Sequence, residues 1–417
     1  MITAFTNAFK VEELRKKILF TLGMIALYRL GAHIPVPGID PLAVQAQVTA
    51  TTTGVLGLLN LFSGGALQQF AVFSLGIMPY ITATIIMQLL TAVIPKIEQW
   101  SKEGETGQRK ITQVSRYLTL AIGFVESIGY IALFQNLLRV QFSWPTRIVM
   151  LISLLAGTAF IMWMGELITQ RGIGNGMSLL IFASIIARFP AAIVQAFQLS
   201  NPAWVAVVAV IFLGVIIAIV YMEKAQRRIP VQYAKRIVGR KVYGGAGTYI
   251  PMKINGANVI PIIFASALLA FPGTIAKLSN VPVLVTFSNY FAPQSPFYLL
   301  AFALLIIFFT YFYTALVFNP IDLADNLRKQ GGFIPGVRPG KNTVTYIENV
   351  LNRINLPGAL FLAAIAITPT LLFLTTNVTA LQQFGGTSIL IMVGVSLETM
   401  NQLESQLKMR HYDGFFK

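Results

Sequence analysis

The stretch AWVAVVAVIFLGVIIAIVYM, residues 203–222, contains no charged side chain. About 20 apolar residues in an α-helix cross the hydrocarbon core of a bilayer, so this segment predicts a membrane span. Similar runs recur along the 417 residues, of which 55% are hydrophobic and only 11% charged, with a mean hydropathy of +0.70. A soluble domain carries roughly a quarter charged residues, and a barrel would show short alternating strands. We therefore predict an all-α polytopic membrane protein.

The distribution of charge predicts how the spans are oriented. Residues 35–69 contain no Lys or Arg, whereas the segments after spans two, six and eight are strongly basic. Because Lys and Arg concentrate on the cytoplasmic side, both termini are predicted to be cytoplasmic. The first apolar run lacks the small-residue cleavage site of a signal peptide. The ten predicted spans are 18–34, 70–94, 117–138, 148–168, 177–198, 203–222, 257–276, 297–318, 354–374 and 387–406.

Two basic loops, 223–256 and 319–353, are longer than positive-inside bias requires. Alternating residues and glycines in 227–253 predict a hairpin-like arm. Glycines and prolines in 327–341 predict tight turns that present Phe333, Ile334 and Arg338 at a tip. An ordered basic surface fits an acidic partner such as ribosomal RNA, and the alternative is a solvated loop attracted to anionic lipid.

Few side chains in the spans could perform chemistry. The chain has no cysteine and two histidines, and no phosphate-binding loop or metalloprotease motif occurs. We therefore expect no catalytic, cofactor or metal site, which argues against a membrane enzyme. The ionisable span residues are Arg29, Glu126, Glu166 and Glu398. Of these, Glu126 and Glu398 could serve a secondary transporter of a small solute, or could be helix-packing or lateral polar contacts.

Aliphatic side chains dominate the spans instead. Ile77 and Ile81 lie four residues apart and share a helix face. A ring of such residues would form a constriction that excludes water and ions without charge, although isoleucines also commonly face lipid or a neighbouring helix. Pro79 and Pro261 occupy similar contexts in spans two and seven, a weak sign of a duplicated half with proline-interrupted helices.

The segment GLLNLFSGGALQQF, residues 57–70, begins like a membrane helix and is then broken by Ser63-Gly64-Gly65. Its apolar part is far too short to cross a bilayer. Non-spanning backbone at membrane depth is tolerated where it lines a cavity or is buried in protein. The two glycines predict a flexible joint before span two, which is expected to begin at Phe70.

Eight motifs in this order resemble the SecY/Sec61 alpha family, the channel subunits of protein translocases, in its bacterial form. They are YRLGAHIPVPGID (28–40), NLFSGG (60–65), FSLGIMPYITATIIMQLL (73–90), KEGETGQRK (102–110), GIGNGMSLLIFASI (172–185), RRIPVQYAKR (227–236), VIPIIFAS (259–266) and GGFIPGVRPG (331–340).

The resemblance implies ten transmembrane helices in two pseudo-symmetric five-helix halves, a clamshell around an hourglass pore. The N-terminal half would be residues 1–198, with a plug at about 55–69. The C-terminal half would be residues 199–417, with cytoplasmic loops 223–256 and 319–353.

It also implies site residues, by motif position. The pore ring would be Ile77, Ile81, Met177, Ile181, Ile263 and Ile391, with methionine where isoleucine is common. The plug would comprise Leu58, Leu59, Asn60, Leu61, Phe62, Ser63, Gly64 and Gly65. The lateral gate would include Thr82 and Phe271, and motor or ribosome docking would involve Arg240, Lys241 and Arg338.

The implied function is a protein-conducting channel in the bacterial plasma membrane. It would translocate unfolded secretory proteins and release transmembrane segments sideways into lipid. Energy would come from outside, since the chain has no nucleotide-binding motif. The implied partners are SecE, SecG, the SecA motor, the ribosome, signal-bearing polypeptides and membrane lipids.

Overall fold

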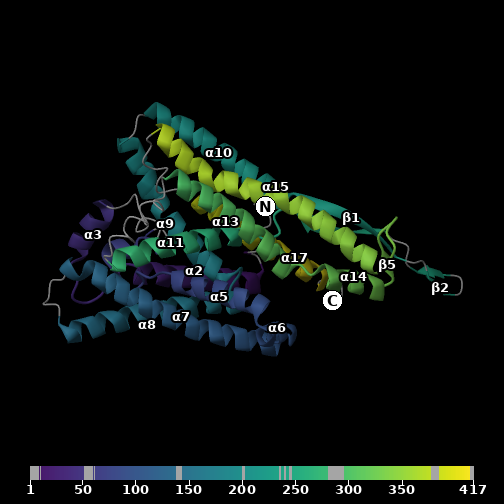
Figure 1. Cartoon of the computed structure of the whole chain (residues 1–417), viewed down its shortest axis with the longest axis horizontal. Helices are drawn as coiled ribbons and strands as arrows, with labels where there is room; N and C mark the ends of the chain where they lie inside the picture. Colours follow the sequence, from purple (N-terminus) through teal and green to yellow (C-terminus); the bar gives the residue numbers. More distant parts are fainter. Residues whose placement is uncertain are drawn as a thin grey trace.

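The structure is a computed structural model, largely helical, in which apolar helices run side by side and a β-structured arm extends from one end (Figure 1). It describes residues 9, 11–50, 60, 62–137, 143–199, 202–233, 236–238, 241–243, 247–279, 295–376 and 385–413. The first helices are α2 (Glu12–Gly31), α3 (Pro41–Ala50), α5 (Met78–Val93), α6 (Pro95–Lys102), α7 (Glu105–Phe134), α8 (Trp144–Arg171) and α9 (Gly176–Leu199). The others are α10 (Pro202–Lys224), α11 (Ile260–Ser279), α13 (Pro296–Val317), α14 (Pro320–Lys329), α15 (Lys341–Thr376) and α17 (Gly386–Asp413), with 3₁₀ turns η1 (Ala66–Gln69) and η2 (Gln135–Leu137).

Each predicted span overlaps an apolar helix of the described chain. Six helices there are long and apolar enough to cross a membrane, and the bent pair α5–α6 would make seven. The two helices of that pair meet at 101°, so α6 turns sharply away from the direction of α5. A multi-pass membrane protein is therefore confirmed, while the number of ten spans stays a prediction.

The expected start of span two at Phe70 is wrong, because α5 begins at Met78. Residues 70–77 form turns, with an isolated β-bridge between Ala71 and Pro35 and positive φ angles at Phe70 (43°) and Gly76 (58°). Ser74 Oγ stabilises them by donating to the carbonyl oxygens of Ala66 and Ala71. Hydropathy does not detect this break, since the turn residues are as apolar as the helix that follows.

The two prolines do not interrupt helices. Pro79 is the second residue of α5 and Pro261 the second residue of α11. A proline in the first helical turn lacks only an N–H that would have no partner in the helix. Both prolines therefore mark where a helix begins.

Neighbouring helices pack in two series. The pairs α5–α7, α7–α8 and α8–α9 are in contact, as are α11–α13, α13–α15 and α15–α17. The series meet where α9 lies against α17 and where α11 lies against α5 and α7. A glycine permits one close approach: a Cβ at Gly157 of α8 would overlap the backbone carbonyl of Val72.

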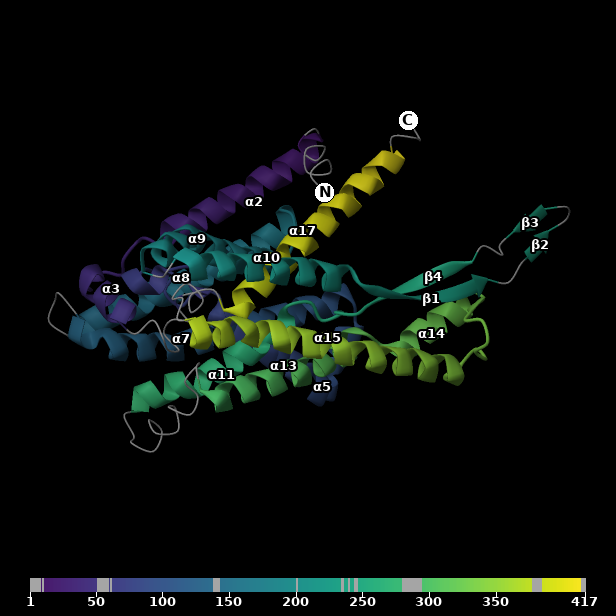
Figure 2. The same ribbon diagram turned by 90° about the horizontal axis from the view of Figure 1, so that it is seen from above.

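A small β-structure forms the arm (Figure 2). Strand β1 (Gln226–Tyr233) pairs antiparallel with β4 (Thr248–Lys253) and β5 (Gly332–Phe333), and β2 (Arg236–Val238) pairs with β3 (Lys241–Tyr243). The predicted hairpin in 227–253 is therefore confirmed. Figure 2 also shows that α2 starts, and α17 ends, toward the end of the bundle from which the arm extends.

The predicted tip is wrong for Ile334. This side chain is 2% exposed and packs with Ile229, Val231 and Ile347 in a separate core beneath the arm. Because β5 pairs with β1, the chain after Phe333 turns inward rather than outward. Phe333 and Arg338 remain exposed, as predicted.

Candidate functional site

The six predicted ring positions come from four segments of the fold. Ile77 is the residue before α5 and Ile81 lies in its first turns; Met177 and Ile181 lie on α9, Ile263 on α11 and Ile391 on α17. All belong to, or pack against, one large apolar cluster at the centre of the bundle. Ile391 is 0% and Ile77 1% exposed, so the cluster is closed at these positions. The assignment of these six as a pore ring stays a prediction.

Local hydrogen bonds position the α9 members. Asn175 Oδ1 accepts from the backbone N–H groups of Met177 and Ser178 and so caps the helix. Thr169 Oγ1 accepts from the N–H of Gly176, which ties the helix start to α8. The glycines of GIGNG thus allow the chain to reverse tightly and direct α9 into the apolar cluster.

The short apolar segment is folded against the same cluster. Of the predicted plug, Leu58, Leu59 and Leu61 lie outside the described residues, whereas Asn60, Phe62, Ser63 and Gly64 are buried. A Cβ at Gly76 would lie 3.1 Å from Cα of Ser63, so the segment lies beside the start of α5.

The Ser63-Gly64-Gly65 stretch is a hydrogen-bonded turn. The N–H of Gly65 donates to Asn60 O at 3.0 Å, and Ser63 Oγ donates to the same carbonyl at 3.2 Å. Gly64 and Gly65 have φ angles of 65° and 91°, which glycine adopts readily. The glycines therefore shape a tight reversal rather than extend a helix.

The predicted gate residues lie on two helices that are in contact, α5 and α11. Thr82 is half-buried, and its hydroxyl donates to Met78 O of the same helix at 3.0 Å. Phe271 lies on α11, but its side chain lies outside what the structure describes. Their role at a lateral gate stays a prediction.

The predicted docking residues lie on the arm and beside it. Arg240 lies outside the described residues, and only the backbone of Lys241, in β3, is described. Arg338 is exposed between β5 and α15, and its carbonyl oxygen accepts from Thr343 Oγ1 at 3.2 Å. The arm therefore presents at least one basic side chain outward from the bundle.

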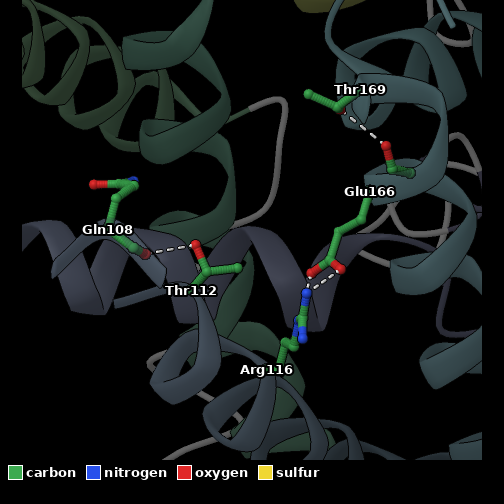
Figure 3. A network of polar contacts seen from close by, with 6 residues as sticks. Gln108, Thr112, Arg116, Glu166 and Thr169 are labelled. Carbon is green, nitrogen blue, oxygen red and sulfur yellow. Dashed lines mark hydrogen bonds and ion pairs between the residues drawn. The ribbon is translucent and has the colours of Figure 1, made fainter. Parts of the chain in front are cut away.

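One of the ionisable span residues has a clear structural partner. Arg116 of α7 donates to both carboxylate oxygens of Glu166 on α8, at 2.8 and 2.6 Å (Figure 3). Such a bidentate pair holds two helices in register. Glu166 is thus explained by helix packing.

The ion pair gives a prediction about stability. In a double-mutant cycle with Arg116→Gln and Glu166→Gln, we expect a coupling free energy of about 1 kcal/mol, because half of the arginine side chain is exposed. Thermal unfolding of the detergent-solubilised variants would measure it. Transport should be retained in both single variants; its selective loss in Glu166→Gln would instead favour a transport role for the carboxylate.

Glu398 lines a polar pocket of about 460 Å³ that runs along residues 394–409 of α17. Glu223 and Lys253 line the same pocket, and Glu223 Oε1 accepts from Asn255 Nδ2 at 2.6 Å. Glu223 was not predicted from the sequence, because it lies at the end of α10 and only its charge distinguishes it from its neighbours. In the described part of the chain, no group of three His, Cys, Asp or Glu side chains could hold a metal ion.

Comparison with known proteins assigns this architecture to a family. The sequence profile named SecY matches residues 71–400. The protein translocase subunits SecY of Streptomyces scabiei and Mycobacterium tuberculosis are 48% and 46% identical over 437 and 442 residues, covering 100% of each chain.

Two solved structures have the same fold. One, described as a protein-conducting channel, gives a TM-score of 0.66 at 18% identity and covers 94% of this chain and 92% of the other. The other, from work on the plug domain of SecY in the closed state, gives a TM-score of 0.59 at 18% identity and covers the same shares of the two chains. With full-length identity near one half to curated SecY subunits, the chain belongs to the SecY family.

Proposed function

We propose that the chain forms a protein-conducting channel through which unfolded polypeptides cross a membrane. The observation that supports this function is the large buried apolar cluster to which the predicted ring positions of four segments belong, or against which they pack, with residues 62–65 folded against it. An aliphatic constriction binds no particular side chain, so it can admit any sequence and still exclude ions.

The path would lie between two halves, residues 1–198 and 199–417, with Ile77, Ile81, Met177, Ile181, Ile263 and Ile391 as the ring. Residues about 55–69 would be the plug that fills the resting pore. Thr82 and Phe271 would belong to a lateral gate between α5 and α7 on one side and α11 and α13 on the other; α11 is in contact with both α5 and α7. An apolar signal segment gains about 25 cal/mol per Å² on leaving water, which favours its exit sideways into lipid.

The chain would act in the bacterial plasma membrane with both termini in the cytoplasm. Its basic arm would dock the SecA motor or the ribosome through Arg240, Lys241 and Arg338, and SecE and SecG would complete the complex. Ribosome-bound channels among the structural neighbours support that partner: Sec61 in a canine ribosome–channel complex has a TM-score of 0.59 at 17% identity. We infer that the chain is not itself an enzyme. The small-solute transporter is not favoured by any of these relatives.

Photo-crosslinking tests the path. With a stalled secretory chain in the channel, crosslinkers at Ile81 and Ile263 should capture it at least about tenfold more often than a crosslinker at Ile217. Ile217 lies on α10 and is 69% exposed on the bundle surface, so it serves as the lipid-facing control. Equal capture at all three positions would contradict the proposed path.

A further inference from the structure

Arg29 makes a contact that the sequence does not predict. It lies in the last turn of α2, half-buried, and its Nη1 donates to the backbone carbonyl oxygen of Gly64 at 2.8 Å. An arginine within a membrane helix needs a polar partner. Here that partner is the main chain of the segment that folds against the predicted ring.

Gly64 itself lies in a narrow slot between α2 and α9. A Cβ at Gly64 would lie 3.0 Å from Arg29 Nη1 and 3.0 Å from Cα of Ser184. Ser184 is in turn held by Tyr28, since their hydroxyl oxygens lie 2.6 Å apart. Gly64 also has a φ of 65°, which a residue with a side chain rarely adopts. The slot therefore fits this glycine and this backbone conformation.

The charges around Arg29 favour the position in which the segment is bound to it. Arg188 of α9 is close enough to Arg29 for electrostatic repulsion, so the two cations oppose each other. The Gly64 carbonyl supplies Arg29 with an acceptor in a partly buried site. When the segment leaves, Arg29 loses that acceptor while Arg188 remains. Departure of the segment is thus opposed by the arginine that holds it.

We propose that Arg29 is the latch of the plug, a positioning residue that holds residues 62–65 in the resting position through the Gly64 carbonyl. This inference rests on the proposed function, because it takes the segment to be the plug. A cation in the last turn of a helix also interacts favourably with the helix dipole. That simpler role of Arg29 would leave the position of the segment unchanged when the residue is replaced.

The chain contains no cysteine, so Ser63→Cys gives a single thiol on a side chain that is 1% exposed at rest. In full-length channel in sealed vesicles, a membrane-impermeant maleimide should label this thiol slowly. Adding Arg29→Gln should raise the labelling rate about tenfold, the effect of losing one hydrogen bond from a charged donor. Ion leakage through the resting channel should rise in parallel.

Two further variants make the test specific. Arg147→Gln removes another arginine, on α8, and should leave labelling unchanged. Gly64→Ala keeps Arg29 but fills the slot, so it should also raise labelling, and it replaces Arg29→Gln if that variant does not accumulate. Unchanged labelling in Arg29→Gln, or in Gly64→Ala where Arg29→Gln does not accumulate, or an equal rise in Arg147→Gln, would overturn the latch.

The experiments distinguish the proposed role of Arg29 from the proposed role of the segment as a plug. If Arg29→Gln raises labelling without leakage, the latch stands and the sealing role of the segment falls. If deletion of residues 57–67 causes leakage but Arg29→Gln changes neither labelling nor leakage, the plug stands and the latch falls.

Discussion

Deletion of residues 57–67 should raise the ion conductance of the resting channel by about an order of magnitude. The described part of this segment is buried against the apolar cluster, with Phe62 3% exposed and Ser63 in contact with the start of α5. Without it, the aliphatic ring would have to exclude water and ions alone. A ring that can widen for a polypeptide is not expected to seal as tightly as a ring with a segment packed upon it.

Planar bilayers containing the purified full-length channel would measure this conductance. The deletion removes Leu58 and Leu59, which lie outside the described residues, together with the buried Phe62 and Ser63. A deletion of equal length at residues 281–291, in the predicted external segment after span seven, is the matched control and should not leak. Unchanged conductance in the first variant would reduce the segment to an ordinary external loop.

Hydropathy and charge were sufficient to locate the bundle. Every predicted span overlaps a helix because a run of apolar residues in a membrane has few alternatives to a helix. The arm was predictable for a different reason: apolar and polar residues alternate in 227–253, and β1 pairs with β4 there. Patterns of residues within single segments were thus sufficient to predict the helices and the hairpin.

Contacts between segments could not be predicted in the same way. The start of α5 at Met78 depends on Ser74 bonding to Ala66, and the burial of Ile334 depends on β5 pairing with β1. The Arg29–Gly64 bond joins residues 35 positions apart through a backbone carbonyl, which leaves no mark on the sequence. The ring and plug assignments came from motif resemblance rather than from physical pattern, so they stay predictions.

Charge reversal at Arg338 should reduce motor-driven export about tenfold while the level of the channel protein stays unchanged. The Arg338 side chain is exposed, and among the described residues its hydrogen bond is made by the carbonyl oxygen, which accepts from Thr343 Oγ1. The turn itself is shaped by Gly336 and Gly340, with φ angles of 80° and 107°. Arg338→Glu therefore changes the charge presented to an acidic partner without disturbing the packing beneath it.

Export of a secretory precursor into inverted membrane vesicles would measure the effect, and immunoblotting would report the amount of channel. Because exposed charges are screened by salt, the difference in export from wild type should shrink as ionic strength rises.

Lys341→Glu makes the same charge change at the exposed start of α15 and should have a smaller effect if Arg338 contacts the motor directly. Ile334→Asp should instead lower the amount of channel, since it places a carboxylate in the core beneath the arm. If Arg338→Glu lowered the amount of channel protein as Ile334→Asp does, the arginine would be structural. If the amount of channel protein stayed unchanged while export was lost, the tip would be a docking surface.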